Sequence, residues 1–233
     1  MTELHTPQLS AHALGQRMRD QARETHLIFN SILVSVAVAN AAYVLALLLA
    51  SGISPTLWLP FLMASLGFVF VTLAGTLPGN LLLVSMPDWS DGALPLFQTM
   101  ALFLMFSLLM PVGSTLPLLV DWYLAVGAHS LIGAFWMRHV VSKMTAASYE
   151  AALLPLFQSH VSWARRTSIK AASVGTFWVS VWVVIRFWVA PHHPELLRWQ
   201  GLLGLMALVG SIGIIALNER YRRVFVRQAL LIE

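Results

Sequence analysis

The chain has 233 residues, of which 58% are hydrophobic and 10% are charged, and its mean hydropathy is +0.75. Soluble domains carry about a quarter charged residues and slightly less than half apolar ones, so this composition excludes an ordinary soluble domain. The net charge is +4, but the basic residues flank apolar runs, which argues against a nucleic-acid partner. The chain has no cysteine, which excludes disulfides, CxxC redox sites and thiolate metal ligands.

The N-terminal segment, residues 1–26, is polar. The first apolar run starts at Leu27 and is too long to be the apolar part of a cleavable signal peptide. Ser10 is a candidate helix N-cap, and Leu14 and Met18 have the spacing of one helical face. We therefore predict a short amphipathic helix on the cytoplasmic membrane surface, followed by a retained membrane helix.

Six apolar runs are long enough to cross a bilayer, which takes roughly 20 helical residues. They cover residues 27–50, 56–76, 93–112, 116–137, 171–190 and 199–217. Turn-forming residues at 51–55 and 113–115, and a longer loop at 77–92, connect the first four runs. We expect an all-α protein in which residues 27–217 form a six-helix transmembrane bundle.

The basic residues give this bundle an expected orientation. Of the 14 Lys and Arg residues, three lie in segment 1–26, five in the loop 138–170 and four in the tail 218–233. Six spans put all three segments on one side of the membrane, and positively charged flanks favour the cytoplasm. The sequence therefore predicts a multi-pass protein of the plasma membrane, the bacterial inner membrane, with both termini in the cytoplasm.

Three ionisable residues inside the spans are candidates for an intramembrane polar site: Asp121, His129 and Arg186. At 1.5 Å per helical residue, Asp121 and Arg186 would both lie about 6–8 Å below the outer boundary, where they could pair. Such a pair is either structural or part of a substrate pathway, and Arg186 could instead snorkel or contact Trp182 one turn earlier. His129, near mid-span, would relay protons, bind a ligand or hydrogen-bond a neighbouring helix.

Two spans carry many small side chains, which allow membrane helices to approach closely. In the first and sixth spans these are Ser31, Ser35, Ala39, Ala42 and Ala46, and Gly201, Gly204, Ala207, Gly210 and Gly213. The pattern predicts tight packing, but it fits an interface within the chain and an oligomer equally well.

The loop between the fourth and fifth spans contains a candidate docking surface. Residues 145–154 predict a helix that ends before Pro155, because the residue preceding a proline avoids the α conformation. The apolar residues around this proline are Tyr149, Leu153, Leu154, Leu156 and Phe157. Exposed apolar side chains beside charges commonly mark a docking surface, so we expect partners to bind here.

Residues 150–152, Glu-Ala-Ala, resemble the cytoplasmic EAA loop of ABC importer permeases, which docks onto an ATPase. The resemblance covers three residues, and the glycine and the Leu-Pro that complete the motif are absent at the motif's spacing.

No GxSxG, HExxH or Walker A motif is present, and no metal or cofactor site is indicated. We therefore expect a non-catalytic membrane subunit of a secretion, conjugation or export assembly. Its partners would be the lipid bilayer and other membrane or cytoplasmic subunits. The alternative is a small transporter or ABC-type permease, with Asp121, His129 and Arg186 near its pathway.

Overall fold

The computed structural model is all-α, and it describes residues 30–81 and 89–230, together with Ser10, residues 12–14, Gln16 and Asp20. Its α-helices are α2 (Asn30–Ala50), α3 (Pro55–Leu81), α4 (Trp89–Ser107), α5 (Asp121–Ser142), α6 (Leu154–Val184), α7 (Ala190–His192) and α8 (Gln200–Leu230). A π-helical segment, Ile185–Val189, joins α6 to α7, and 3₁₀ helices cover Ala146–Ser148, Ala151–Leu153 and Pro194–Trp199.

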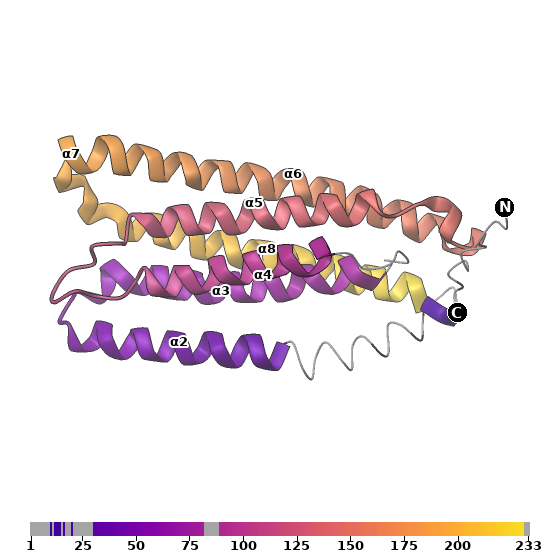
Figure 1. Cartoon of the computed structure of the whole chain (residues 1–233), viewed down its shortest axis with the longest axis horizontal. Helices are drawn as coiled ribbons and strands as arrows, with labels where there is room; N and C mark the ends of the chain where they lie inside the picture. Colours follow the sequence, from indigo (N-terminus) through magenta and orange to yellow (C-terminus); the bar gives the residue numbers. More distant parts are fainter. Residues whose placement is uncertain are drawn as a thin grey trace.

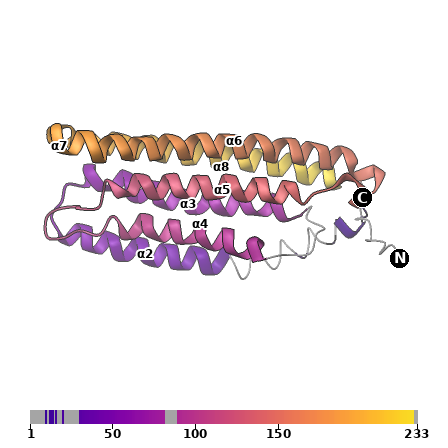
Figure 2. The same ribbon diagram turned by 45° about the horizontal axis from the view of Figure 1, so that its top comes forward.

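The long helices α2 to α6 and α8 lie side by side and alternate in direction (Figures 1 and 2). α5 packs along α4 and α6, and α3 packs along α8. The turn after α2, the α4–α5 connection and α7 lie at one end of the bundle, here called the α7 end (Figure 1). Segment 143–153 and the C-terminal part of α8 lie at the opposite end, here called the basic end (Figure 1).

Three helical stretches among the described residues are long and apolar enough to cross a membrane: Pro55–Leu73, Ala151–His192 and Pro194–Phe225. Ser35–Ala50 and Leu96–Ser107 are shorter apolar helices. Large apolar side chains are exposed along the bundle, which soluble monomers rarely show as a continuous surface. Length, composition and exterior are together those of a multi-pass membrane protein.

The connection between the third and fourth predicted spans is longer than the sequence pattern indicated. α4 ends at Ser107 and α5 begins at Asp121. Pro111 and Pro117 lie between them, and proline ends a helix because it lacks a backbone donor and clashes with the preceding turn. Gly113 has a φ of +60°, as expected for the predicted turn. The prediction that α-helix continued to Val112 and resumed at Leu116 was therefore wrong.

The predicted helix at 145–154 is also wrong. Two short 3₁₀ turns lie in this region, and α6 begins at Leu154 with Pro155 in its first turn. Proline fits there because the first N–H groups of a helix have no partner within the helix. α6 then continues to Val184, so residues 154–170 belong to a long helix and not to a loop.

The loop predicted at 77–92 is shortened from both sides. α3 continues through Pro78 to Leu81, and α4 begins at Trp89. Residues 82–88 lie outside the described part of the chain.

Small residues of α8 pack against α3 as predicted. A Cβ atom on Gly201 would lie 2.6 Å from the carbonyl oxygen of Thr56, and one on Gly204 would lie 3.0 Å from Phe61 and Pro60. Larger side chains at these positions would force the helices apart. Ala207 is buried, whereas Gly210 and Gly213 have open space around them.

The small residues of the first helix do not form its internal packing face. Ser35, Ala39, Ala42 and Ala46 are exposed, and the side chain of Ser31 lies outside the described part of the chain. The buried face of α2 consists of Ala37, Ala41, Val44 and Leu48.

A second close crossing, not predicted from the sequence, joins α5 to α6. A Cβ atom on Gly127 would lie 3.0 Å from the carbonyl oxygen of Gly175, and a Cβ atom on Gly175 would lie 2.9 Å from that of Gly127. The aromatic core around Trp122, Tyr123 and Trp178 lies next to this crossing, and the rings of Tyr123 and Trp178 are stacked.

Candidate functional site

A cavity of about 550 Å³ lies between α6 and α8, with residues of α3, α4 and α5 forming the rest of its wall. Its volume falls within the range of about 300–1,000 Å³ that is typical of small-molecule sites. α6 contributes Ser159, Trp163, Arg166, Thr167, Lys170, Ala171 and Val174, and α8 contributes Ile214, Leu217, Asn218, Arg220, Tyr221 and Val224. The remaining wall is Phe68, Val71, Thr72, Gln98, His129, Ser130, Gly133, Trp136 and Met137.

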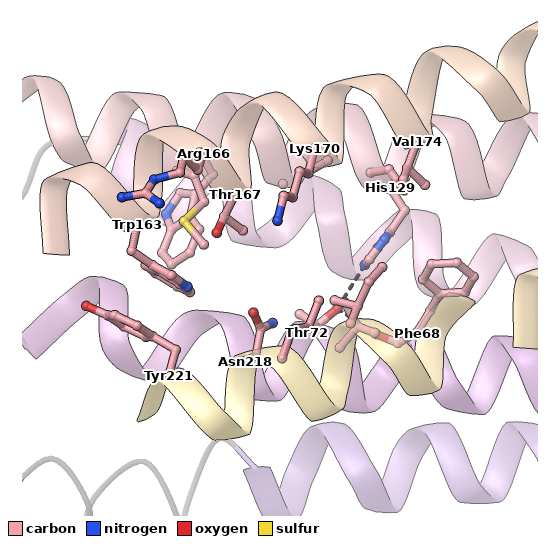
Figure 3. A pocket seen from close by; sticks show the side chains of 18 of the residues that line it. Phe68, Thr72, His129, Trp163, Arg166, Thr167, Lys170, Val174, Asn218 and Tyr221 are labelled. Atoms are coloured by element: carbon pink, nitrogen blue, oxygen red, sulfur yellow. Dashed lines mark hydrogen bonds between the residues drawn. The ribbon is translucent and has the colours of Figure 1, made fainter. Parts of the chain in front are cut away.

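Three cationic side chains line this cavity: Arg166, Lys170 and Arg220. Figure 3 shows the ammonium group of Lys170 directed into the space between α6 and α8. The lining residues, all in the described part of the chain, include no Asp or Glu. The three cations are exposed, and Nη2 of Arg166 donates a hydrogen bond to Oγ of Ser162 at 2.7 Å. The lining therefore has a net positive charge, which attracts anions.

Two buried amides also line the cavity. The side chains of Gln98 and Asn218 are only 7% and 6% exposed, and neither makes a hydrogen bond to another described residue. Buried polar groups in proteins usually have a hydrogen-bond partner. Figure 3 shows the amide of Asn218 pointing between the two helices. Both amides can donate to and accept from a bound molecule.

His129 lies at the end of the cavity away from Trp163 (Figure 3). Its Nε2 atom lies 2.8 Å from Oγ1 of Thr72, whose hydroxyl also lies 3.0 Å from the carbonyl oxygen of Phe68. Because the hydroxyl has one hydrogen and donates it to that carbonyl, it accepts from His129 Nε2–H. His129 thus joins α5 to α3, which confirms the interhelical hydrogen bond considered from the sequence. A proton-relay or ligand role remains a prediction.

The basic end of the cavity is closed by aromatic side chains. Trp163 and Tyr221 both line it, and their rings are stacked with centroids 4.1 Å apart. The hydroxyl of Tyr221 lies 2.8 Å from Nδ1 of His160, and Phe225 lies against both rings. This group joins α6 to α8 at a point where the cavity would otherwise separate them.

Asp121 and Arg186 are not part of the cavity. Asp121 lies in the first turn of α5, where a carboxylate is favoured by the helix dipole, and its Oδ1 accepts a hydrogen bond from Trp182 Nε1 at 3.0 Å. The described residues contain no ion pair between Asp121 and Arg186, and Arg186 is exposed in the π-helical segment. The expected partner of Asp121 is thus replaced by Trp182.

The apolar residues predicted to form an exposed docking surface are largely buried. Tyr149, Leu153, Leu156 and Phe157 are buried and Leu154 is partly buried. They pack with Leu14 and Phe225 at the basic end. The expectation that they are exposed is therefore wrong, because the start of α6 folds these side chains onto α8 and the N-terminal segment.

The described residues 12–14, Gln16 and Asp20 of the N-terminal segment are helical. The backbone N–H of Ala13 donates to Oγ of Ser10 at 3.1 Å, which confirms the predicted cap. Leu14 faces the protein, since it is fully buried, and Met18 lies outside the described residues.

The sequence interpretation missed the cavity because it assigned Arg166, Lys170 and Arg220 to topology alone. Trp163, Arg166, Lys170 and Val174 recur at three- and four-residue spacing, which is one helical face. This spacing could have indicated a shared helical face. The face could be recognised only once α6 was known to begin at Leu154, because residues 154–170 had been assigned to a loop.

No known protein family matches the chain, and neither does any curated protein or solved structure. The function is therefore inferred from the charge and geometry of the cavity itself.

Proposed function

We propose that this chain is a small membrane transport protein that binds an organic anion in the cavity between α6 and α8. The observation that carries the proposal is the set of three cations, Arg166, Lys170 and Arg220, around a cavity whose described lining has no carboxylate. All three side chains are exposed in the chain itself, so they are accessible to a ligand that lies between α6 and α8. An anion there would be attracted by the three positive charges.

The remaining lining fits the organic part of such a ligand. Phe68, Val71, Val174 and Ile214 offer apolar contacts, and the amides of Gln98 and Asn218 offer hydrogen bonds. Small-molecule sites generally combine mostly apolar walls with a few well-placed polar groups.

The proposal includes six spans, with the basic end in the cytoplasm. α2 and α4 contain apolar helices beside the three longer candidates, and α5 packs between α4 and α6, where its buried polar residue His129 is shielded. Lys143 begins the segment at the basic end, and Arg222 and Arg227 lie in the C-terminal part of α8 at the same end (Figure 1). Such residues favour the cytoplasm.

We prefer this transporter alternative to the assembly-subunit hypothesis. The docking surface that the latter placed around Pro155 consists of side chains that pack inside the chain. Partners could still bind the cytoplasmic face, but they would have to bind residues other than those around Pro155.

The test is the thermal unfolding of the full chain in a neutral detergent, with and without a long-chain alkyl phosphate. A ligand that binds only the folded state stabilises it by about 2.7 kcal/mol at a hundredfold excess over its Kd. We expect the melting temperature to rise, and to rise far less in the double variant Arg166→Gln/Lys170→Gln. An alkyl maltoside of the same chain length should have no such effect.

Arg165→Gln is the matched control, because Arg165 is exposed like Arg166 but does not line the cavity. It should respond to the alkyl phosphate as the wild type does. If all variants and the wild type respond alike, the cations of the cavity do not bind the anion and the proposal fails.

A further inference from the structure

We infer that the anion is an acidic phospholipid that enters the cavity sideways, between α6 and α8, from the leaflet at the basic end. This inference rests on the proposed function and names the class of its ligand.

The first observation is where the cavity opens. Leu217 and Val224 of α8 line it, yet they are 58% and 48% exposed on the exterior of the bundle. Other apolar residues of the same two helices, such as Ile212 of α8 and Ile169 of α6, are also exposed. The cavity is therefore continuous with a surface that, in a membrane protein, faces lipid chains.

The second observation is that a route along the bundle axis is closed. At the basic end the stacked rings of Trp163 and Tyr221 lie across the gap between the two helices, and Phe225 is fully buried behind them. A water-soluble anion that arrives along the axis from the basic end would have to displace this aromatic group. A lipid already in the leaflet would not.

The third observation is the order of groups along the cavity. The cations on α6 lie one helical turn apart, and Val174 lies another turn deeper, about 6 Å along the axis. Figure 3 shows Arg166 and Lys170 toward the Trp163 side, and Phe68 and Val174 at the far side. A phosphate near the cations therefore places its acyl chain among apolar side chains.

Phosphate is the anion that fits this set of donors. A guanidinium presents a planar pair of N–H groups that matches two phosphate oxygens, and a lysine ammonium adds a compact charge. The amide of Asn218 lies across the space from Lys170 (Figure 3), where it can reach the phosphate or glycerol oxygens of a phospholipid. The second acyl chain would lie outside, against Leu217 and Val224.

The experiment is native mass spectrometry of the full chain released from detergent micelles, with three probes. These are phosphatidylglycerol, phosphatidylcholine with the same acyl chains, and glycerol 3-phosphate, which has the anionic head but no chain. We expect one retained phosphatidylglycerol, at least tenfold less phosphatidylcholine, and no displacement by glycerol 3-phosphate. Retention should fall at least fivefold in Arg166→Gln/Lys170→Gln and stay unchanged in Arg165→Gln.

A second pair of variants tests the position of the acyl chain. Ala171→Phe adds a ring at a residue that lines the cavity, and should reduce phosphatidylglycerol retention without removing a charge. Ser173→Phe adds the same ring at an exposed residue outside the lining and should not. Melting temperatures without added lipid show whether either variant has lost its fold.

Three results would overturn the inference. Equal retention of both lipids in every variant would mean unspecific annular binding. Binding of glycerol 3-phosphate that depends on Arg166 and Lys170, without retention of phosphatidylglycerol, would identify a soluble anion and leave the proposed function standing. If no phosphate compound binds, the alkyl phosphate included, both this inference and the proposed function are wrong.

Discussion

Trp163 of α6 stacks face to face on Tyr221 of α8, with ring centroids 4.1 Å apart and ring planes 5° from parallel. Because these helices border the cavity on opposite sides, the stack holds the two walls together at the basic end. It also sets the limit of the space that a ligand can occupy.

This stack should contribute a measurable coupling energy. Stacked aromatic pairs are worth about 0.5–1.5 kcal/mol beyond the burial of their surface. In a double-mutant cycle of Trp163→Leu and Tyr221→Leu, the free energies of unfolding in detergent should be non-additive by that amount. The exposed pair Phe135→Leu and Trp188→Leu should be additive. Additive effects in the first pair would show that the rings act independently.

Asp121 provides a second prediction, because its partner is Trp182 and not Arg186. Trp182→Phe removes the N–H donor and leaves the carboxylate without it, which costs about 1–3 kcal/mol. Arg186→Gln changes an exposed side chain and should stay within about 0.5 kcal/mol. Thermal unfolding of both variants distinguishes the two. A larger loss of stability in Arg186→Gln than in Trp182→Phe would support the ion pair that was expected from the sequence.

The sequence predicted the all-α class, the turns at Gly52 and Gly113, and the glycine contacts of α8, because each depends on local residue type. It did not predict the bounds of α4, α5 and α6. Long apolar runs indicate membrane-length helices, and a glycine at a turn indicates a backbone conformation that other residues avoid. The Ser10 cap was visible for the same reason.

The sequence alone did not show which helix faces pack against one another. Pro155 can follow the end of one helix or lie in the first turn of the next. In the structure Leu153 and Phe157 pack with Phe225, and Pro155 lies at the start of α6. The partner of Asp121 was mistaken because Pro117 moves the start of α5 to Asp121, which changes its depth and its neighbours. The cavity forms because α6 and α8 lie opposite one another, and no local sequence pattern predicts that arrangement.

Burial of the residues around Pro155 makes a third prediction. Leu153 is fully buried, and replacing a buried leucine by alanine costs about 2–5 kcal/mol, with serine at least as costly. Leu153→Ser should therefore lower the melting temperature strongly, whereas Leu196→Ser, at an exposed position, should change it little. Normal stability of Leu153→Ser would mean that this side chain is available to partners after all.

The proposed orientation makes a fourth prediction, and the absence of native cysteine makes it simple to test. Single variants Ser114→Cys and His193→Cys should react in intact cells with a thiol reagent that does not cross the inner membrane. Ser148→Cys and Gln228→Cys should react only after the membrane is opened. Reaction of Ser148→Cys in intact cells would contradict both the six spans and the cytoplasmic basic end.

The most direct test of the account is whether an anion occupies the cavity, measured as protection of a single cysteine from a thiol reagent. Thr167→Cys places the thiol in the cavity lining, and Ser173→Cys places one on the exposed surface of the same helix. In neutral detergent, a long-chain alkyl phosphate should slow the labelling of Thr167→Cys at least fivefold and leave that of Ser173→Cys unchanged. Equal rates with and without the alkyl phosphate at Thr167→Cys would contradict the account.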